Sequence, residues 1–167
     1  MLNENPNKKG TLGEVAVCKE FLKLGYEVFS EVGSHSKVDL IILDENYKTY
    51  KIQIKAVTST KNVIEIYSIK NCLNPKYNSG YDVRQIDIFA ICIIDKDLVF
   101  YVTSKELLRN GKSTKFRFSA CKNGQLKNVR FINDYLDFKK ALRDYTPRAQ
   151  TLKKTGDEIV QTTTLLS

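Results

Sequence analysis

The chain has 167 residues, of which 42% are hydrophobic, so it is long enough for one domain with a buried core. This composition excludes intrinsic disorder, and no apolar run approaches the roughly 18 residues of a membrane-spanning helix. The polar start, MLNENPNKKG, lacks the apolar stretch of a signal peptide. We therefore expect a soluble intracellular domain with no membrane partner.

The cysteines form neither a metal-binding nor a disulfide pattern. They are scattered without a CxxC pair, and the chain has a single histidine, His35. A zinc site needs clustered ligands, and a disulfide framework needs an oxidising compartment. We expect all four to be small core residues: Cys18, Cys72, Cys92 and Cys121.

Positive charge is concentrated in the second part of the chain. Residues 1–104 carry 13 basic and 13 acidic residues, so the whole excess of +8 lies in 105–167. Within 105–133, eight basic residues accompany one acid and are interleaved with phenylalanines. This predicts a polyanion partner, most simply nucleic acid, although a merely solvated face would give the same count. The candidate DNA contacts are Lys112, Lys115, Arg117, Lys122, Lys127 and Arg130.

Hydrophobic spacing predicts a helix that starts at Thr11 and ends before Gly25, with a broad apolar side that includes Leu12, Val15 and Leu22. The expected later elements are strands at 26–31, 38–43, 49–57, 62–69, 86–94, 98–103 and 115–119, a short helix at 104–109, and a helix at 133–145 capped by Asn133. These elements predict an α/β class (an α+β mixed sheet), in which an opening helix precedes a central mixed β-sheet with additional C-terminal strands and a helix. We expect a single domain over 1–147 and a polar, partly disordered tail over 148–167.

The hairpin formed by 38–43 and 49–57 brings polar groups together. If its loop is 45–47, Asp39 lies opposite Gln53, with Cβ atoms about 5 Å apart. Lys55 then lies on the same face, about 7 Å farther along. A one-residue slip would turn these polar groups into the core, so the pattern itself favours this register. The same register pairs apolar residues on the other face: Leu40 with Ile52, and Ile42 with Tyr50.

A carboxylate, an amide oxygen and a lysine at this spacing suit metal-assisted cleavage of phosphodiesters. Asp39 would bind Mg²⁺, which prefers oxygen ligands, and Gln53 would offer its amide oxygen. Lys55 would orient or deprotonate the attacking water and stabilise developing charge. The candidate for the further carboxylate is Glu14 on the first helix.

Each of these residues also has a simpler interpretation. Glu14 stands three residues after Thr11, as in a capping box. Gln53 and Lys55 would also fit the solvated face of a half-buried strand, and Asp39 would fit a turn. The catalytic hypothesis depends on their occurrence together.

Glu14, Val38-Asp39 and Gln53-Ile54-Lys55 together resemble the PD-(D/E)XK nuclease superfamily, a restriction-endonuclease-like fold. The chain is most similar to its bacterial group I intron-encoded homing endonucleases, in which a glutamine replaces the usual second acid. The resemblance implies Glu14 and Asp39 as metal carboxylates, Gln53 as a variant third ligand, and Lys55 as the catalytic lysine. It also implies a catalytic core over 10–103 and a basic DNA-binding elaboration over 104–147.

The resemblance implies a Mg²⁺-dependent, site-specific homing endonuclease that makes double-strand breaks in DNA, with Mn²⁺ able to substitute. Such a protein would be a homo-oligomer, dimer or tetramer, that needs no small-molecule cofactor, in a bacterial or phage-like cytoplasm and associated with the nucleoid. Alternatives with the same chemistry are a restriction-type nuclease and a Holliday junction resolvase. An alternative of another class is a catalytically inactive DNA-binding module.

Overall fold

The computed structural model describes residues 5–33, 36–67, 69–70, 79–109, 113–120 and 129–145. Its α-helices are α1 (Pro6–Lys23), α2 (Ser104–Arg109) and α3 (Phe138–Asp144), with short 3₁₀ helices η2 (Ile94–Lys96) and η3 (Ile132–Tyr135). Its strands are β1 (Glu27–Ser30), β2 (Leu40–Leu43), β3 (Thr49–Val57), β4 (Val63–Tyr67), β5 (Ile69–Lys70), β6 (Ser79–Gly80), β7 (Ile88–Ile93), β8 (Leu98–Thr103) and β9 (Ser113–Arg117). None of the described helices is long and apolar enough to cross a membrane.

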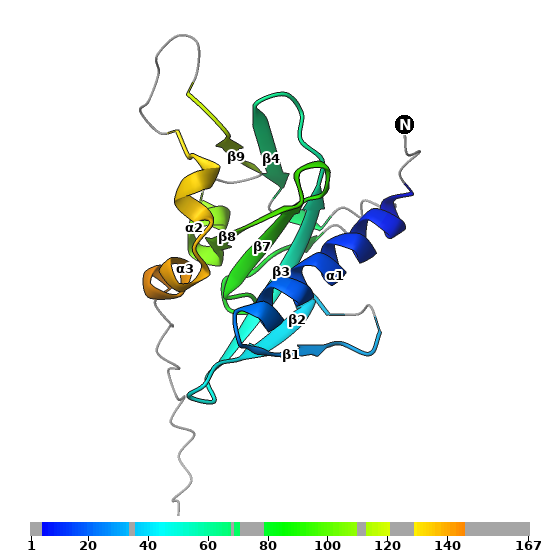
Figure 1. Cartoon of the computed structure of the whole chain (residues 1–167), viewed down its shortest axis with the longest axis vertical. Helices are drawn as coiled ribbons and strands as arrows, with labels where there is room; N and C mark the ends of the chain where they lie inside the picture. The colour runs from blue at the N-terminus through cyan, green and yellow to red at the C-terminus, as the bar shows by residue number, and fades with distance from the viewer. Residues whose placement is uncertain are drawn as a thin grey trace, which may run out of the picture.

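The central sheet has five strands in the order β1-β2-β3-β7-β8. The β3–β7 pair is parallel and the other pairs are antiparallel, which confirms the predicted mixed sheet. The predicted hairpin register is also confirmed, because Leu40 pairs with Ile52 and Ile42 with Tyr50. Strands β4 and β9 form a separate two-stranded ribbon, seen at the top of Figure 1.

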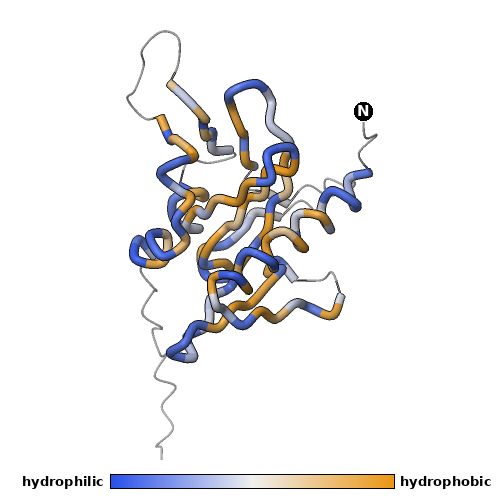
Figure 2. The backbone as a smooth tube through the Cα atoms, viewed as in Figure 1, coloured by the Kyte–Doolittle hydropathy of each residue, from blue (hydrophilic) through white to orange (hydrophobic). Residues whose placement is uncertain are grey.

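Both faces of the central strands are covered. Alternate residues of β7 enter two apolar clusters, so all six of its residues are buried. The helices α1 and α3 contribute to one cluster, where Phe21 and Phe138 have ring centroids 4.9 Å apart. The ribbon, α2 and η3 contribute to the other. Figure 2 shows the hydrophobic residues gathered along the central strands, as the continuous apolar run of β7 predicted.

The first helix begins earlier than predicted. It starts at Pro6, and the side chain of Asn5 caps it by accepting a hydrogen bond from the N–H of Asn7. An asparagine cap followed by proline at the first helical position favours this start. Thr11 lies inside the helix, where its hydroxyl donates to the carbonyl of Asn7. The capping-box interpretation of Glu14 is therefore wrong.

The broad apolar side predicted for this helix is also wrong. Only a narrow stripe of α1 is buried, made of Gly13, Val17 and Phe21. Leu12, Val15 and Leu22 are exposed. Spacing alone cannot separate the two groups, because each has separations of three, four or seven residues, which keep side chains on one side of a helix.

The predicted final helix is divided in two. Residues 132–135 form η3, and α3 begins only at Phe138. Its cap is Asp137, which accepts from the N–H of Lys139, so the predicted Asn133 cap is wrong.

Gly13 sets the distance between α1 and β3. A Cβ atom at this position would lie 2.7 Å from the Cβ of Ala56, closer than real Cβ contacts. The absent side chain of Gly13 and the small side chain of Ala56 thus let the helix lie directly on the strand. This contact places the next helical residue, Glu14, at the end of β3.

We expect Gly13→Ala to lower the free energy of unfolding by about 1–3 kcal/mol, because the added methyl overpacks the contact with Ala56. Gly10→Ala in the same helix is the matched control, since nothing lies within 4 Å of its added Cβ. The control should gain about 0.5–1 kcal/mol from helix propensity. Urea unfolding measures both, and equal stabilities would contradict the close approach.

Candidate functional site

Asp39 stands where β2 leaves β3. Its N–H donates to the carbonyl of Ile52 at 2.9 Å, which continues the hairpin ladder by one residue. The next hydrogen bond along β3 is made to a side chain instead of the backbone, because the N–H of Ile54 donates to Asp39 Oδ2 at 2.7 Å. The carboxylate thus takes the place that a β2 carbonyl would occupy. This backbone contact fixes Asp39 beside the second half of β3.

Gln53 is held against the same carboxylate. Its amide nitrogen donates to Asp39 Oδ2 and also to the carbonyl of Ile54, at 3.0 Å for the latter. The side-chain atom of Gln53 that faces these two oxygens must be a donor, so it is the amide nitrogen rather than the amide oxygen. The amide oxygen is then the atom of Gln53 that could bind a metal. Gln53 is only 7% exposed, so this orientation is enforced by packing as well.

Lys55 lies two residues farther along β3, on the same face as Gln53. Its ammonium nitrogen donates to the hydroxyl of Tyr81 at 2.6 Å and lies 4.4 Å from the centroid of the tyrosine ring. Tyr81 was not singled out by the sequence, because it lies between the strands predicted at 62–69 and 86–94, where no element was expected. No spacing rule links a loop tyrosine to a strand lysine, so nothing in the sequence signalled this contact.

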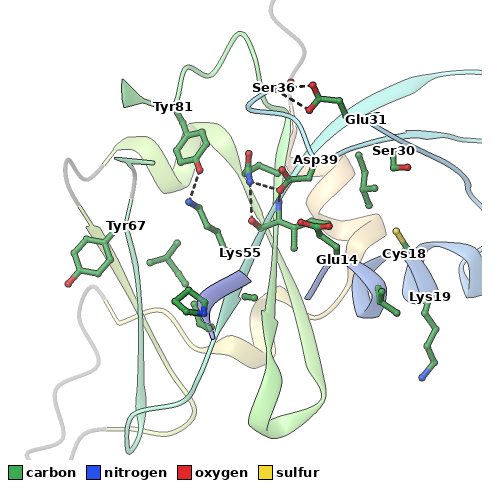
Figure 3. A pocket seen from close by; sticks show the side chains of 18 of the residues that line it. Glu14, Cys18, Lys19, Ser30, Glu31, Ser36, Asp39, Lys55, Tyr67 and Tyr81 are labelled. Carbon is green, nitrogen blue, oxygen red and sulfur yellow. Dashed lines mark hydrogen bonds between the residues drawn. The ribbon is translucent and has the colours of Figure 1, made fainter. Parts of the chain in front are cut away.

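Glu14 enters the site from α1. In Figure 3 its carboxylate points from the helix toward Asp39, across the pocket from Tyr81. All four predicted catalytic residues line one cavity of about 1160 Å³. The structure therefore brings Glu14, Asp39, Gln53 and Lys55 to one place.

The donor set fits a hard divalent cation. It offers two carboxylates and one amide oxygen beside an open cavity, and Mg²⁺ binds through one or two carboxylates while it keeps several waters. Within the described residues, no group of three His, Cys, Asp or Glu side chains could hold a metal. Gln53 adds an amide oxygen to these carboxylates rather than a further acid.

Other polar groups of the cavity have separate tasks. Both carboxylate oxygens of Glu31 accept from the N–H of Ser36, which closes the loop before Asp39. Burial, and secondarily the charge of Glu14, raises the pKa of the Cys18 thiol. Cys18 is thus a neutral thiol at pH 7 rather than a thiolate. Cys18 and Cys92 are free cysteines, and Cys72 and Cys121 lie outside the described residues.

The ribbon β4–β9 carries two of the predicted DNA contacts. Its inner face is apolar, with Ile64, Ile66 and Phe116 in the core. Lys115 and Arg117 alternate with these on β9, and Lys115 Nζ lies 3.9 Å from Glu65 on the facing strand. Glu65 also lines the cavity that holds Asp39 and Lys55, so the outer face of the ribbon is continuous with it.

The other predicted DNA contacts differ in position. Arg130 is half-buried and paired with an acid, because its Nε donates to Glu106 at 3.0 Å and the same carboxylate accepts from Tyr135. Burial, and then the Glu106 hydrogen bond, raises the pKa of Tyr135. The remaining predicted DNA contacts, Lys112, Lys122 and Lys127, lie outside the described residues. His35 also lies outside them.

Three comparisons bear on this arrangement. A family model described as PD-(D/E)XK endonuclease matches residues 4–138. Protein 5.3 of Escherichia phage T7 is 27% identical over 113 residues, which cover 64% of this chain and 91% of that protein. The solved structure of a bacterial homing endonuclease, I-Ssp6803I, superposes with a TM-score of 0.63 at 19% identity, covering 86% of this chain and 100% of the other.

Gln53→Glu should lower the free energy of unfolding by about 1–3 kcal/mol in EDTA at neutral pH. The substitution replaces two hydrogen-bond donors with a second carboxylate against Asp39. Gln85→Glu, on the exposed turn before β7, is the matched control and should change stability by less than about 0.5 kcal/mol. Equal losses in urea unfolding would show that the Asp39–Gln53 contact does not hold the site.

Proposed function

Because the chain belongs to the PD-(D/E)XK endonuclease family, we propose that it is a Mg²⁺-dependent, site-specific nuclease that makes double-strand breaks in DNA. The observation that carries the proposal is the meeting of Glu14, Asp39, Gln53 and Lys55 in one open cavity. These residues come from an opening helix and a hairpin, and the side-chain contacts of Asp39 hold the hairpin part in place.

The residues of the chain would divide the chemistry as follows. Glu14, Asp39 and the amide oxygen of Gln53 would hold Mg²⁺, with Mn²⁺ as a substitute. When bound, the ion would supply Lewis-acid stabilisation of the charge that develops on the phosphate. Lys55 would orient the attacking water and stabilise the same charge with its ammonium group. Asp39 would keep its geometry throughout, because backbone and side-chain donors already fix one of its oxygens.

A homing-type activity is the finer form of this proposal. It is supported by the likeness of the fold to a homing endonuclease over nearly the whole chain and by a glutamine at the position of the second acid. One catalytic set cuts one strand, and the strands of a duplex run antiparallel. Two subunits related by symmetry would present one catalytic set to each strand, so we propose that the protein acts as a homo-oligomer, dimer or tetramer.

Cleavage can be tested with a mixed pool of long linear duplexes and four-way junctions in Mg²⁺ or Mn²⁺, followed by sequencing of the ends. We expect recurrent ends at one long target in linear duplexes. Cuts confined to junctions would instead identify a junction resolvase, and cuts at a short repeated sequence a restriction-type nuclease. DNA binding without cleavage in either metal would identify an inactive binding module.

We expect Lys55→Met and Asp39→Asn to reduce the cleavage rate by about 10²-fold or more. The first removes the ammonium group that would stabilise the developing charge, and the second weakens the carboxylate that would hold the metal. The asparagine oxygen can still accept from Ile54 and Gln53, so Asp39→Asn should fold and bind DNA normally in EDTA. Lys23→Met, which removes an exposed lysine on α1, should cleave at the wild-type rate. A Lys55→Met protein as active as wild type would remove the lysine from the reaction.

The ribbon face is proposed to carry DNA contacts beside the cavity. Lys115 is exposed, and its pairing with Glu65 at 3.9 Å across open surface is weak. A duplex bound over the cavity would lie along this face, because Glu65 and Tyr67 line both. Lys115 and Arg117 would then contact phosphates.

Lys115→Ala and Arg117→Ala should each weaken DNA binding and reduce the slope of log affinity against log salt by about 0.9, the effect of one lost phosphate contact. Lys48→Ala is the matched control, because this exposed lysine lies in the β2–β3 turn, at the end of the molecule away from the ribbon in Figure 1. Fluorescence anisotropy at several salt concentrations measures both effects. Unchanged slopes would exclude the ribbon from DNA binding.

A further inference from the structure

We propose that Tyr81 is a positioning residue that fixes the ammonium group of Lys55 for cleavage. This inference rests on the nuclease function proposed above and adds a residue to its site. Figure 3 shows Tyr81 and Lys55 pointing at each other across one end of the cavity. The tyrosine hydroxyl accepts the lysine hydrogen bond at 2.6 Å, and the ring lies within cation–π distance at 4.4 Å.

Tyr81 is itself held in place. Its ring packs edge-on against Phe89, with centroids 5.3 Å apart and planes at 87°. Phe89 is fully buried on β7 and pairs directly with Gln53 of β3. The position of the phenol is thus set by β7, the strand paired with β3, which carries both the proposed metal-binding amide and the lysine.

The backbone on both sides of Tyr81 is fixed as well. The ammonium group of Lys37 donates to the carbonyl of Gly80 at 2.7 Å, which ties this segment to the loop just before Asp39. On the other side, Asp82 accepts backbone hydrogen bonds from Gln85 and, with its side chain, from Arg84. Tyr81 therefore stands between a strand end bonded to Lys37 and a hydrogen-bonded turn that begins at Asp82.

Lysine needs such a partner more than the other catalytic groups do. Its long side chain loses about 2 kcal/mol of rotamer entropy when it is fixed. Asp39 and Gln53 are held by the strand backbone and by each other, and the Lys55 ammonium is bonded to Tyr81. A displacement of about 1 Å at a reacting group can cost about 10²-fold in rate. Tyr81 supplies the restraint for this side chain before DNA binds.

The test compares Tyr81→Phe, Tyr81→Leu and wild type on the duplex recovered from the cleavage pool. Cleavage is measured in single turnover at saturating protein, affinity by titration in EDTA, and stability by urea unfolding. Tyr81→Phe keeps the ring on Phe89 and loses only the hydroxyl, so we expect about 10-fold slower cleavage or more, with affinity and stability unchanged within twofold. Tyr81→Leu should lose stability too, and phenylalanine should restore the stability without restoring the rate. Tyr47→Phe, at an exposed turn, is the matched control.

Two results would overturn the inference: Tyr81→Phe that cleaves at the wild-type rate, or Tyr81→Phe whose slower cleavage is matched by weaker binding or lower stability. Both leave the proposed nuclease function intact, because the wild type cuts in parallel. If the wild type cuts no DNA in either metal, the proposed function fails, and the role of Tyr81 fails with it.

Discussion

The site depends on how closely α1 lies on β3. The hairpin can place an aspartate, a glutamine and a lysine on one face, but the remaining carboxylate belongs to a helix that precedes it in the chain. Gly13 against Ala56 permits a backbone approach that any larger pair would prevent. A wider separation would leave the hairpin intact and withdraw Glu14 from it. The smallest side chains in this contact therefore decide whether four polar groups form one site.

The end of β2 makes the second contribution. Where this strand turns away, β3 continues with backbone N–H groups that no longer face a neighbouring strand on that side. The Asp39 carboxylate accepts a hydrogen bond from one of them, and the same oxygen accepts a second hydrogen bond from the amide of Gln53. A single oxygen atom thus completes the sheet and orients the site. Buried polar groups arranged in this way are stable only when their hydrogen bonds are made, which favours one geometry over its alternatives.

Much of this could be predicted from the sequence, and the failures have identifiable causes. The register of the hairpin followed from alternation, because a slip would bury Lys55 and expose Ile52. The predicted bounds of β3, β8 and α2 also agree with the structure. The start of α1 did not, because the cap at Asn5 lies in a polar stretch without hydrophobic periodicity. The partner of Lys55 could not be predicted, because Tyr81 and Lys55 are brought together by the pairing of β7 with β3, which lie far apart in the sequence. For the same reason no pattern distinguishes Arg117, on the ribbon, from Arg130, whose side chain is hydrogen-bonded to Glu106.

The parallel pairing of β3 with β7 has a consequence for the nascent chain. All four polar residues of the cavity leave the ribosome within the first 55 positions, but the strand that supports β3 on its far side follows some thirty residues later. Non-local parallel pairing forms late, after its loop has closed. An incomplete chain thus carries all four polar residues without the strand that supports β3. The cavity is complete only after β7 has been synthesised and has paired with β3.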